Sequence, residues 1–329
     1  MERNTEKRTE RLSADPDGIA RAAELLSAGR LVAFPTETVY GLGADAMDGR
    51  AAAGVFEAKG RPRFNPLIAH APDVEAAARL VRLDPRAERL AAAFWPGPLT
   101  LVAPRRTEGG LAEIVTAGLE TAAVRVPAHP VAQALLRAVG RPIAAPSANP
   151  SGAVSPTTAQ HVLDGLGGRI DAVLDAGPCA IGLESTILKA EPDGVRLLRA
   201  GGAPREAVEE ALGARLLEAD PGAPVQAPGA LARHYAPSVR LRLDAARPEP
   251  GEGWLGFGPD PRFETPPAVA LNLSPSGDPR EAAAALFAGL REIDRAMGGG
   301  GSVAVARIPA AGLGEAIRDR LKRAATPEG

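Results

Sequence analysis

The chain has 329 residues, enough for two domains or for one large domain with an appendage. Hydrophobic residues make up 45% and aromatic residues only 3%, which predicts a globular protein whose core is packed mostly from Leu, Val, Ile and Ala. The single cysteine, Cys179, excludes a disulfide framework and a cysteine-ligated metal site, and the net charge of −2 confines any nucleic-acid surface to a local patch.

Residues 1–14 are predicted to form a frayed polar extension. They alternate charges without an apolar core and so do not resemble a signal peptide. The sequence has no run of about 18 apolar residues, which argues against a membrane span. The four histidines are too scattered for a metal cluster, and we expect no metal site. The expected location is the cytoplasm.

Residues 15–217 alternate between predicted helices and strands without strict β-α-β regularity. Pro130 and Gly140 mark the ends of one helix, and Pro35 ends the first apolar run. We expect helices at 19–28, 50–59, 73–80, 85–94 and 130–139, and strands at 31–34, 67–70, 99–103, 122–126, 142–145, 172–174, 185–188 and 195–198. The pattern predicts a mixed α/β sheet.

The composition changes after Leu217. Residues 218–237 carry repeated Pro and Gly without an apolar period and are predicted to be an interdomain linker. Residues 238–329 predict a smaller α/β unit, with strands at 239–243, 253–257, 269–273 and 302–306 and helices at 282–297 and 313–323. Its run Gly298-Gly-Gly-Gly301 favours a flexible turn over a phosphate-binding loop.

The first polar stretch, Phe34-Pro-Thr-Glu-Thr-Val-Tyr-Gly-Leu-Gly43, follows a predicted strand directly. Its glycines fit the loose dinucleotide-binding pattern, but Thr, Glu and Tyr intervene after the strand, and Arg61 stands where a ribose-binding acid is expected. Two interpretations remain: a polar turn that needs its glycines for a positive φ, or a loop whose hydroxyl groups contact a polar substrate.

The second stretch, Lys59-Gly-Arg-Pro-Arg-Phe-Asn-Pro-Leu-Ile-Ala-His70, is basic. Lysine is rare in this chain, so Lys59 beside Arg61 and Arg63 indicates an anion site, because a lysine point charge and an arginine fork both suit phosphate or carboxylate. A solvated basic loop is the alternative. His70 alone is compatible with a packed or capping histidine.

Three further stretches carry polar groups. Arg125 lies inside an apolar strand and faces either solvent or a site. The stretch Ala145-Pro-Ser-Ala-Asn-Pro-Ser-Gly152, with Ser155 after it, is either a plain turn or a set of neutral donors for phosphate oxygens. The last is Glu184-Ser-Thr-Ile-Leu188, with Arg199 ending the next strand.

Two common catalytic motifs are missing. The sequence has no Gly-x-x-x-x-Gly-Lys-Ser/Thr loop and no Gly-x-Ser-x-Gly elbow, and no covalent nucleophile is evident. The remaining Lys, Arg, Thr, Ser and Asn side chains position and neutralise anions. Such a set suits nucleotidyl or phosphoryl transfer by orientation and charge stabilisation.

These five stretches, in this order and followed by Pro228-Gly-Ala-Leu-Ala-Arg-His-Tyr-Ala-Pro237, resemble the Sua5/YrdC family of L-threonylcarbamoyladenylate synthases. The resemblance covers residues 15–212, and the tail is similar to the long Sua5 form. It implies a YrdC-like twisted mixed sheet with a large cavity, plus a smaller C-terminal α/β Sua5-type domain. It also implies that L-threonine, bicarbonate and ATP give threonylcarbamoyl-AMP, pyrophosphate and water, for the t6A modification of tRNA.

The resemblance also implies residue roles. Lys59 and Arg61 would be catalytic and, with Mg2+, would offset the charge of the triphosphate. L-Threonine would be bound by Thr38, His70, Arg125, Ala145 and Ser185. ATP would be bound by Arg61, Asn65, Thr121, Ser147, Asn149, Ser155, Arg199 and Tyr235. Residues 218–237 would then be a lid over the site, in which Ala230-Leu-Ala232 departs from the bulkier and basic residues usual in the family.

Two other functions remain open at this stage. One is a carbamoyltransferase with the same fold, although the zinc-finger segments of such hydrogenase-maturation enzymes need more than one cysteine. The other is an RNA-binding module, which few aromatics and a net charge of −2 make weaker. Partner proteins of tRNA modification, and RNA itself, are expected partners of the enzyme.

Overall fold

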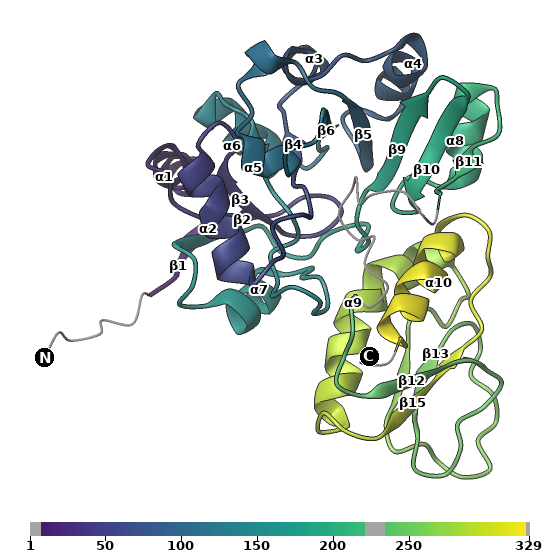
Figure 1. Cartoon of the computed structure of the whole chain (residues 1–329). Helices are drawn as coiled ribbons and strands as arrows, with labels where there is room; N and C mark the ends of the chain where they lie inside the picture. The colour runs from purple at the N-terminus through teal and green to yellow at the C-terminus, as the bar shows by residue number, and fades with distance from the viewer. Residues whose placement is uncertain (1–7, 221–233, 327–329) are drawn as a thin grey trace, which may run out of the picture.

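The computed structural model describes residues 8–220 and 234–326. Figure 1 shows two units, each built on its own sheet. The large sheet has eleven strands in the order β1-β8-β2-β3-β7-β4-β6-β5-β9-β10-β11 and mixes parallel and antiparallel pairs. The smaller sheet has four strands in the order β12-β15-β13-β14, all paired in parallel. The predicted mixed α/β fold with a second, smaller α/β unit is therefore confirmed.

The strands of the large sheet are β1 (Glu10–Ser13), β2 (Val32–Phe34), β3 (Gly41–Asp45), β4 (Ile68–His70), β5 (Leu99–Pro104), β6 (Thr121–Arg125), β7 (Ile143–Ala144), β8 (Ala172–Asp175), β9 (Thr186–Glu191), β10 (Gly194–Arg199) and β11 (Leu217–Glu218). Its helices are α1 (Pro16–Ser27), α2 (Gly49–Lys59), α3 (Val74–Leu80), α4 (Pro85–Phe94), the 3-10 turn η1 (Thr107–Gly109), α5 (Glu113–Thr116), α6 (Pro130–Val139), α7 (Ala159–Leu166) and α8 (Arg205–Leu212).

Local sequence explains where the helices begin and end. The Asp15 and Asp84 side chains accept hydrogen bonds from the first-turn amides of α1 and α4, and a proline follows each of these aspartates at the first helical position. Gly60 and Gly140 end α2 and α6 in the left-handed conformation, which glycine adopts without a steric penalty. No helix in the described part of the chain is long and apolar enough to cross a membrane.

The smaller unit contains β12 (Arg240–Ala245), β13 (Gly253–Gly256), β14 (Ala270–Asn272), α9 (Pro279–Ala296), β15 (Ser302–Ala306) and α10 (Leu313–Ala324). Its core joins α9 and α10 to the sheet through residues such as Leu286 and Ile317. The same cluster includes Val39 and Leu183 of the large unit, so α9 and α10 pack against the large unit as well as against their own sheet (Figure 1).

Two segments differ from the sequence-based expectation. The extension over residues 1–14 is not wholly frayed, because Glu10–Ser13 forms β1, paired in parallel with β8. The stretch behind the first strand contains β3, which pairs with both β2 and β7. Gly43 makes this pairing possible: a Cβ atom there would lie 3.0 Å from the side chains of both Phe34 and Ile143.

Helices α7 and α8 were not predicted either, and they cover residues that the sequence analysis left without an element. Most of the predicted linker, residues 221–233, lies outside the described residues, and with it the Ala230-Leu-Ala232 departure. At the two ends of the linker, Glu218 belongs to β11, and Tyr235 is buried.

Candidate active site

A cavity of about 40 Å3 lies at the ends of central strands of the large sheet, beside the last residues of β4 and β6. The strand register explains which side chains reach it. His70 pairs with Arg125 on the neighbouring strand, and Arg125 pairs in turn with Thr100 of β5. One row across three strands therefore brings polar side chains far apart in sequence to the same place.

Nine of the predicted site residues line this cavity: Thr38, Arg61, His70, Arg125, Ala145, Ser147, Ser185, Arg199 and Tyr235. The other five, Lys59, Asn65, Thr121, Asn149 and Ser155, do not line it. All of these except Thr121 are buried, whereas Thr121 is half-buried at the opposite end of β6 from Arg125.

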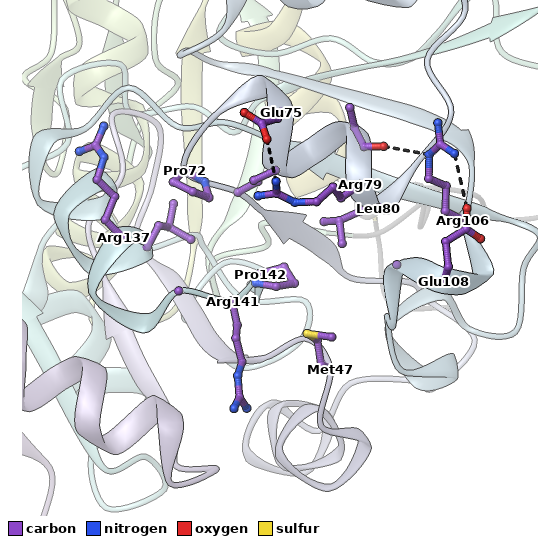
Figure 2. A pocket seen from close by; sticks show the side chains of 16 residues that line it. Met47, Pro72, Glu75, Arg79, Leu80, Arg106, Glu108, Arg137, Arg141 and Pro142 are labelled. Atoms are coloured by element: carbon purple, nitrogen blue, oxygen red, sulfur yellow. Dashed lines mark hydrogen bonds and ion pairs between the residues drawn. The ribbon is translucent and has the colours of Figure 1, made fainter.

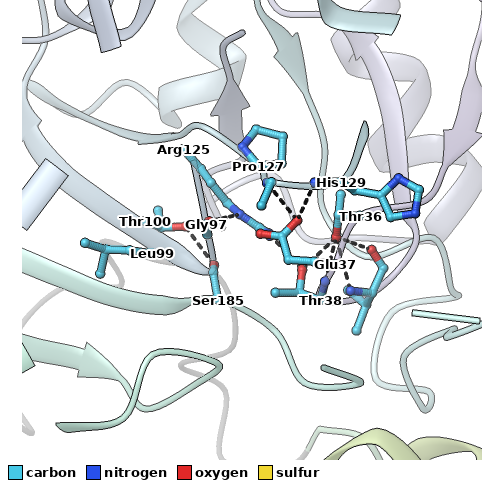
Figure 3. A network of polar contacts seen from close by, with 12 residues as sticks. Thr36, Glu37, Thr38, Gly97, Leu99, Thr100, Arg125, Pro127, His129 and Ser185 are labelled. Carbon is cyan, nitrogen blue, oxygen red and sulfur yellow. Dashed lines mark hydrogen bonds and ion pairs between the residues drawn. The ribbon is translucent and has the colours of Figure 1, made fainter. Parts of the chain in front are cut away.

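Arg125 is fixed by the turn that follows β2 (Figure 3). Its Nη2 atom donates to Glu37 Oε1 at 2.6 Å, and its Nη1 atom donates to the hydroxyl of Thr38 at 2.9 Å. The other carboxylate oxygen of Glu37 accepts the backbone N–H groups of Ala128 and His129. Burial raises the pKa of Glu37, but Arg125 and these hydrogen bonds outweigh it, so the pKa is lowered and the carboxylate stays charged.

Ser185 is held between two side chains, Thr100 of β5 and Arg199 of β10. Its hydroxyl lies 2.7 Å from the Thr100 hydroxyl and accepts from Arg199 Nη2 at 3.2 Å. The same Nη2 atom donates to the Ser185 carbonyl at 2.9 Å. This arrangement fixes the Ser185 side chain in the wall of the cavity before any ligand is bound.

Lys59 contacts the loop after β7 and does not line the cavity. Its Nζ atom donates to the carbonyl oxygens of Ser147, at 2.6 Å, and of Asn149. Burial and the nearby charge of Arg61 place the pKa of Lys59 well below its ordinary value. Lys59 therefore fixes the backbone that presents Ser147 to the cavity.

Arg61 is held by its own loop, donating to the backbone carbonyls of Asn65 at 3.2 Å and Pro66 at 3.0 Å. Burial, with the charge of Arg199, lowers its pKa to about 10, so it remains a cation at neutral pH. Together with Arg125 and Arg199, it gives the cavity three guanidinium groups. Such a wall favours anionic ligands.

Both histidines of the cavity are neutral. Burial lowers the pKa of His70 and of His234 to about 3. The His70 Nδ1 atom lies 3.1 Å from the carbonyl oxygen of Ile68 and must donate to it, because a carbonyl only accepts. The ring therefore carries its proton on Nδ1.

Buried polar atoms near the cavity that lack hydrogen-bond partners among the described residues include Asn65 Oδ1, Asn149 Oδ1 and His234 Nδ1. Asn149 donates through Nδ2 to the carbonyls of Pro150 and Ala153, which fixes the orientation of its amide. Buried acceptors are normally satisfied in folded proteins, so these atoms are suited to a bound ligand.

Several residues of this site were not predicted from the sequence. Glu37, Thr100, Glu184 and His234 either line the cavity or bind a residue that does. Glu37 and Glu184 had a signal in the sequence, because each adjoins a predicted site residue. Thr100 had none, because its role comes from strand pairing.

The site does not fit a protein-bound metal. Within residues 8–220 and 234–326, no three His, Cys, Asp or Glu side chains are grouped so that they could hold an ion. The carboxylates of Glu37 and Glu184 are each engaged by an arginine. The Mg2+ expected with the nucleotide would thus be held by phosphate oxygens.

A larger cavity, of about 880 Å3, lies elsewhere on the large unit, between α3, η1 and α6 (Figure 2). Its rim pairs Arg79 with Glu75 and Arg106 with Glu108. None of the predicted site residues lines it. Its size alone does not make it the active site, because its arginines are exposed or half-buried, whereas the three arginines of the smaller cavity are buried.

Known proteins match both units. A family model covering Sua5, YciO and YrdC, described as "Telomere recombination", matches residues 24–201. A second, described as "Threonylcarbamoyl-AMP synthase, C-terminal domain", matches residues 203–326. A threonylcarbamoyl-AMP synthase of Bacillus subtilis is 47% identical over 247 residues, covering 73% of this chain and 70% of that protein.

The similarity extends over most of the chain in a second relative. A threonylcarbamoyl-AMP synthase of Pyrococcus abyssi is 42% identical over 327 residues. The alignment covers 92% of this chain and 92% of that protein. The crystal structure of P. abyssi Sua5 complexed with L-threonine superposes with a TM-score of 0.85 at 37% identity, covering 96% of this chain and 97% of that one. The chain therefore belongs to the Sua5/YrdC family of threonylcarbamoyl-AMP synthases, in its long Sua5 form.

Proposed function

We propose that this chain converts L-threonine, bicarbonate and ATP into threonylcarbamoyl-AMP, pyrophosphate and water, for the t6A modification of tRNA. The observation that carries the proposal is the cavity in which the Arg125 fork, fixed by Glu37 and Thr38, lies together with two further buried arginines. Relatives with 42–47% identity are threonylcarbamoyl-AMP synthases, and one of them has been crystallised with L-threonine.

The threonine half of the site would be built around Arg125, whose guanidinium suits a carboxylate. The hydroxyls of Thr38 and Ser185 and the ring of His70 are the neutral polar groups available for the amine and the side-chain hydroxyl of threonine. Ala145 can contribute only its backbone groups and its methyl. Ile68 lines the same cavity and would meet the threonine methyl group.

The nucleotide half would use Arg61 and Arg199 for the phosphates and Asn65, Thr121, Ser147, Asn149, Ser155 and Tyr235 for the rest of ATP. Two of these residues suit particular groups. Ser155 gives its hydroxyl proton to Glu184 at 2.5 Å, and the Oδ1 atom of Asn149 can only accept. Both therefore suit ribose hydroxyl or adenine amino groups better than phosphate oxygens.

The chemistry needs no nucleophile from the protein. Bicarbonate would take up a proton and lose water to give CO2. The amine of threonine would then attack the carbon of CO2 and release a proton as the carbamate forms, so the protons of the two steps cancel. A carbamate oxygen would then attack the α-phosphorus of ATP while the bond to the pyrophosphate oxygen breaks, which makes the step a nucleotidyl transfer. The three cavity arginines favour each anion along this path and disfavour an additional ammonium charge.

Substrate entry would require local movement. A cavity of about 40 Å3 is too small for ATP and threonine together. His234 lines it and belongs to the C-terminal end of the predicted linker, so this side chain would be displaced when ATP enters. We propose a cytoplasmic enzyme that hands its labile product to tRNA-modification proteins, as the family resemblance implies.

Pyrophosphate release measured with threonine and bicarbonate omitted in turn tests this function. We expect release only when both are present with ATP. Arg61→Ala and Lys59→Ala are expected to abolish it without unfolding the protein, while Arg63→Ala, an exposed arginine of the same loop, should retain it. Release that does not depend on threonine, or turnover retained in both variants, would contradict these assignments.

A further inference from the structure

Helix α10 of the smaller unit brings a fully buried arginine to the wall of the cavity in the large unit. Arg320 is 0% exposed, and its Nε atom donates to Glu184 Oε2 at 2.9 Å. Its Nη1 atom donates to Asp319 at 2.7 Å. Burying an arginine completely is costly unless its charge is compensated, so this contact across the units is a specific feature of the fold.

Glu184 connects Arg320 to the proposed nucleotide half of the site. Its side chain lines the cavity, and while Oε2 binds Arg320, Oε1 accepts the Ser155 hydroxyl at 2.5 Å. Burial raises the pKa of Glu184, but Arg320, Arg199 and these hydrogen bonds outweigh it and lower the pKa to about 2. The carboxylate is thus charged, and both of its oxygens are fixed.

Arg320 also contacts the aromatic wall of the cavity. Its guanidinium carbon lies 5.2 Å from the centre of the Tyr235 ring, within the range of a cation–π interaction. The same ring stacks on Phe287 of α9, with ring centroids 5.5 Å apart. Its centroid lies 4.0 Å from that of the His234 ring. One arginine therefore holds two cavity residues, Glu184 and Tyr235, that come from different parts of the chain.

We propose that Arg320 is a positioning residue for ATP and that it represents a contribution of the C-terminal unit to the reaction; this inference rests on the proposed function. By engaging Glu184, Arg320 fixes the orientation of that carboxylate in the wall of the cavity that Arg61 and Arg199 also line. It also fixes the Ser155 hydroxyl and the Tyr235 ring in the geometry that ATP meets.

The test compares Arg320→Met with a second ion pair that also joins the units. Arg205 of α8 binds Glu315 of α10 at 2.7 Å, and neither residue lines the cavity. Arg320→Met is expected to lower kcat/KM for ATP, and ATP affinity measured by calorimetry, by about tenfold or more, while the KM for threonine changes by less than about twofold. Arg205→Met is expected to leave all three quantities within about twofold of wild type.

Arg320→Met alone leaves the buried Glu184 carboxylate without its ion-pair partner, which could destabilise the fold. The double variant Arg320→Met/Glu184→Gln removes that carboxylate and so separates a folding defect from a loss of ATP binding. Its thermal stability is expected to recover relative to Arg320→Met, while the loss of ATP affinity remains. Arg320→Lys should restore part of that affinity, since it keeps the charge. Wild-type ATP affinity in Arg320→Met, or in the double variant, would overturn the proposal. A wild-type protein without threonine-dependent turnover would instead contradict the proposed function, and calorimetry would still decide the role of Arg320.

Discussion

Arg125 and Glu37 form a buried ion pair, 2.6 Å between Nη2 and Oε1, that connects a central strand of the large sheet to the turn after β2. The Glu37 carboxylate is itself fixed by two backbone N–H groups, and it in turn fixes the Arg125 guanidinium. A fork fixed in this way is organised for a planar anion before the ligand arrives.

Replacing Arg125 with lysine should therefore weaken threonine binding although the charge is kept. Lysine cannot contact Glu37, Thr38 and the Gly97 carbonyl at the same time, as Arg125 does. We expect the KM for threonine to rise about tenfold or more, with a smaller change for ATP. Steady-state kinetics measure both, and an unchanged threonine KM would exclude Arg125 as the carboxylate clamp.

Stability should fall as the pH drops below neutrality, because His70 and His234 are buried and uncharged. Their pKa values of about 3 lie below the ordinary 6.5, so at intermediate pH the unfolded chain binds protons that the folded chain does not. Between about pH 6.5 and 4.5, each histidine should cost about 1.4 kcal/mol of unfolding free energy per pH unit.

Urea unfolding across this pH range measures the effect, with His70→Gln as the comparison. The variant should show a shallower slope than the wild type, because one of the two proton-binding differences is gone. The buried acid Glu184 enters only at lower pH, since its pKa of about 2 is depressed and its contribution is lost as the pH falls below about 4.5. Equal slopes for the two proteins would show that His70 is not buried as a neutral ring.

ATP binding should be accompanied by proton uptake at Lys59. The pKa of this amine is held well below its ordinary value by burial and by Arg61, and a triphosphate nearby would favour the charged form. At about pH 9 the phosphates are already ionised, so uptake reports on the protein. Calorimetry in buffers of different ionisation enthalpy measures it. Lys59→Arg should abolish the uptake, and binding without uptake by the wild type would contradict the assignment.

Two glycine substitutions should have opposite effects on stability. Gly43→Ala places a Cβ atom 3.0 Å from Phe34 and Ile143 and 3.1 Å from the Val32 carbonyl, so we expect a loss of about 1–3 kcal/mol. Gly54→Ala, within α2, meets Leu31 at 3.5 Å, an ordinary contact, and should gain about 0.5–1 kcal/mol. Chemical denaturation tests both values, and a stable Gly43→Ala protein would mean that β3 is loosely packed.

The sequence was informative where local patterns determine structure. Capping aspartates and prolines such as Asp84 and Pro85 predict helices, and apolar runs such as residues 99–103 predict strands. Strand β3 was missed because its Gly-Leu-Gly-Ala-Asp sequence lacks β-branched residues, and only its fit between neighbouring strands makes it extended. The edge strand β1 was missed because it is short and mostly exposed.

The same distinction applies to the site. Motifs identified the residues of single loops, and nine of those predicted residues line one cavity. Partners distant in sequence could not be predicted: Thr100 reaches Ser185 through strand pairing, and Arg320 reaches Glu184 across the two units, 136 positions along the chain. Lys59 showed an anion-site signal, yet its contacts are backbone carbonyls.

A crystal structure with threonine and a non-hydrolysable ATP analogue bound together would show directly whether one cavity holds both substrates. We expect the threonine carboxylate within hydrogen-bond distance of Arg125 and the triphosphate against Arg61 and Arg199, in one enlarged cavity. Threonine and nucleotide in separate places, or a carboxylate away from Arg125, would contradict this expectation.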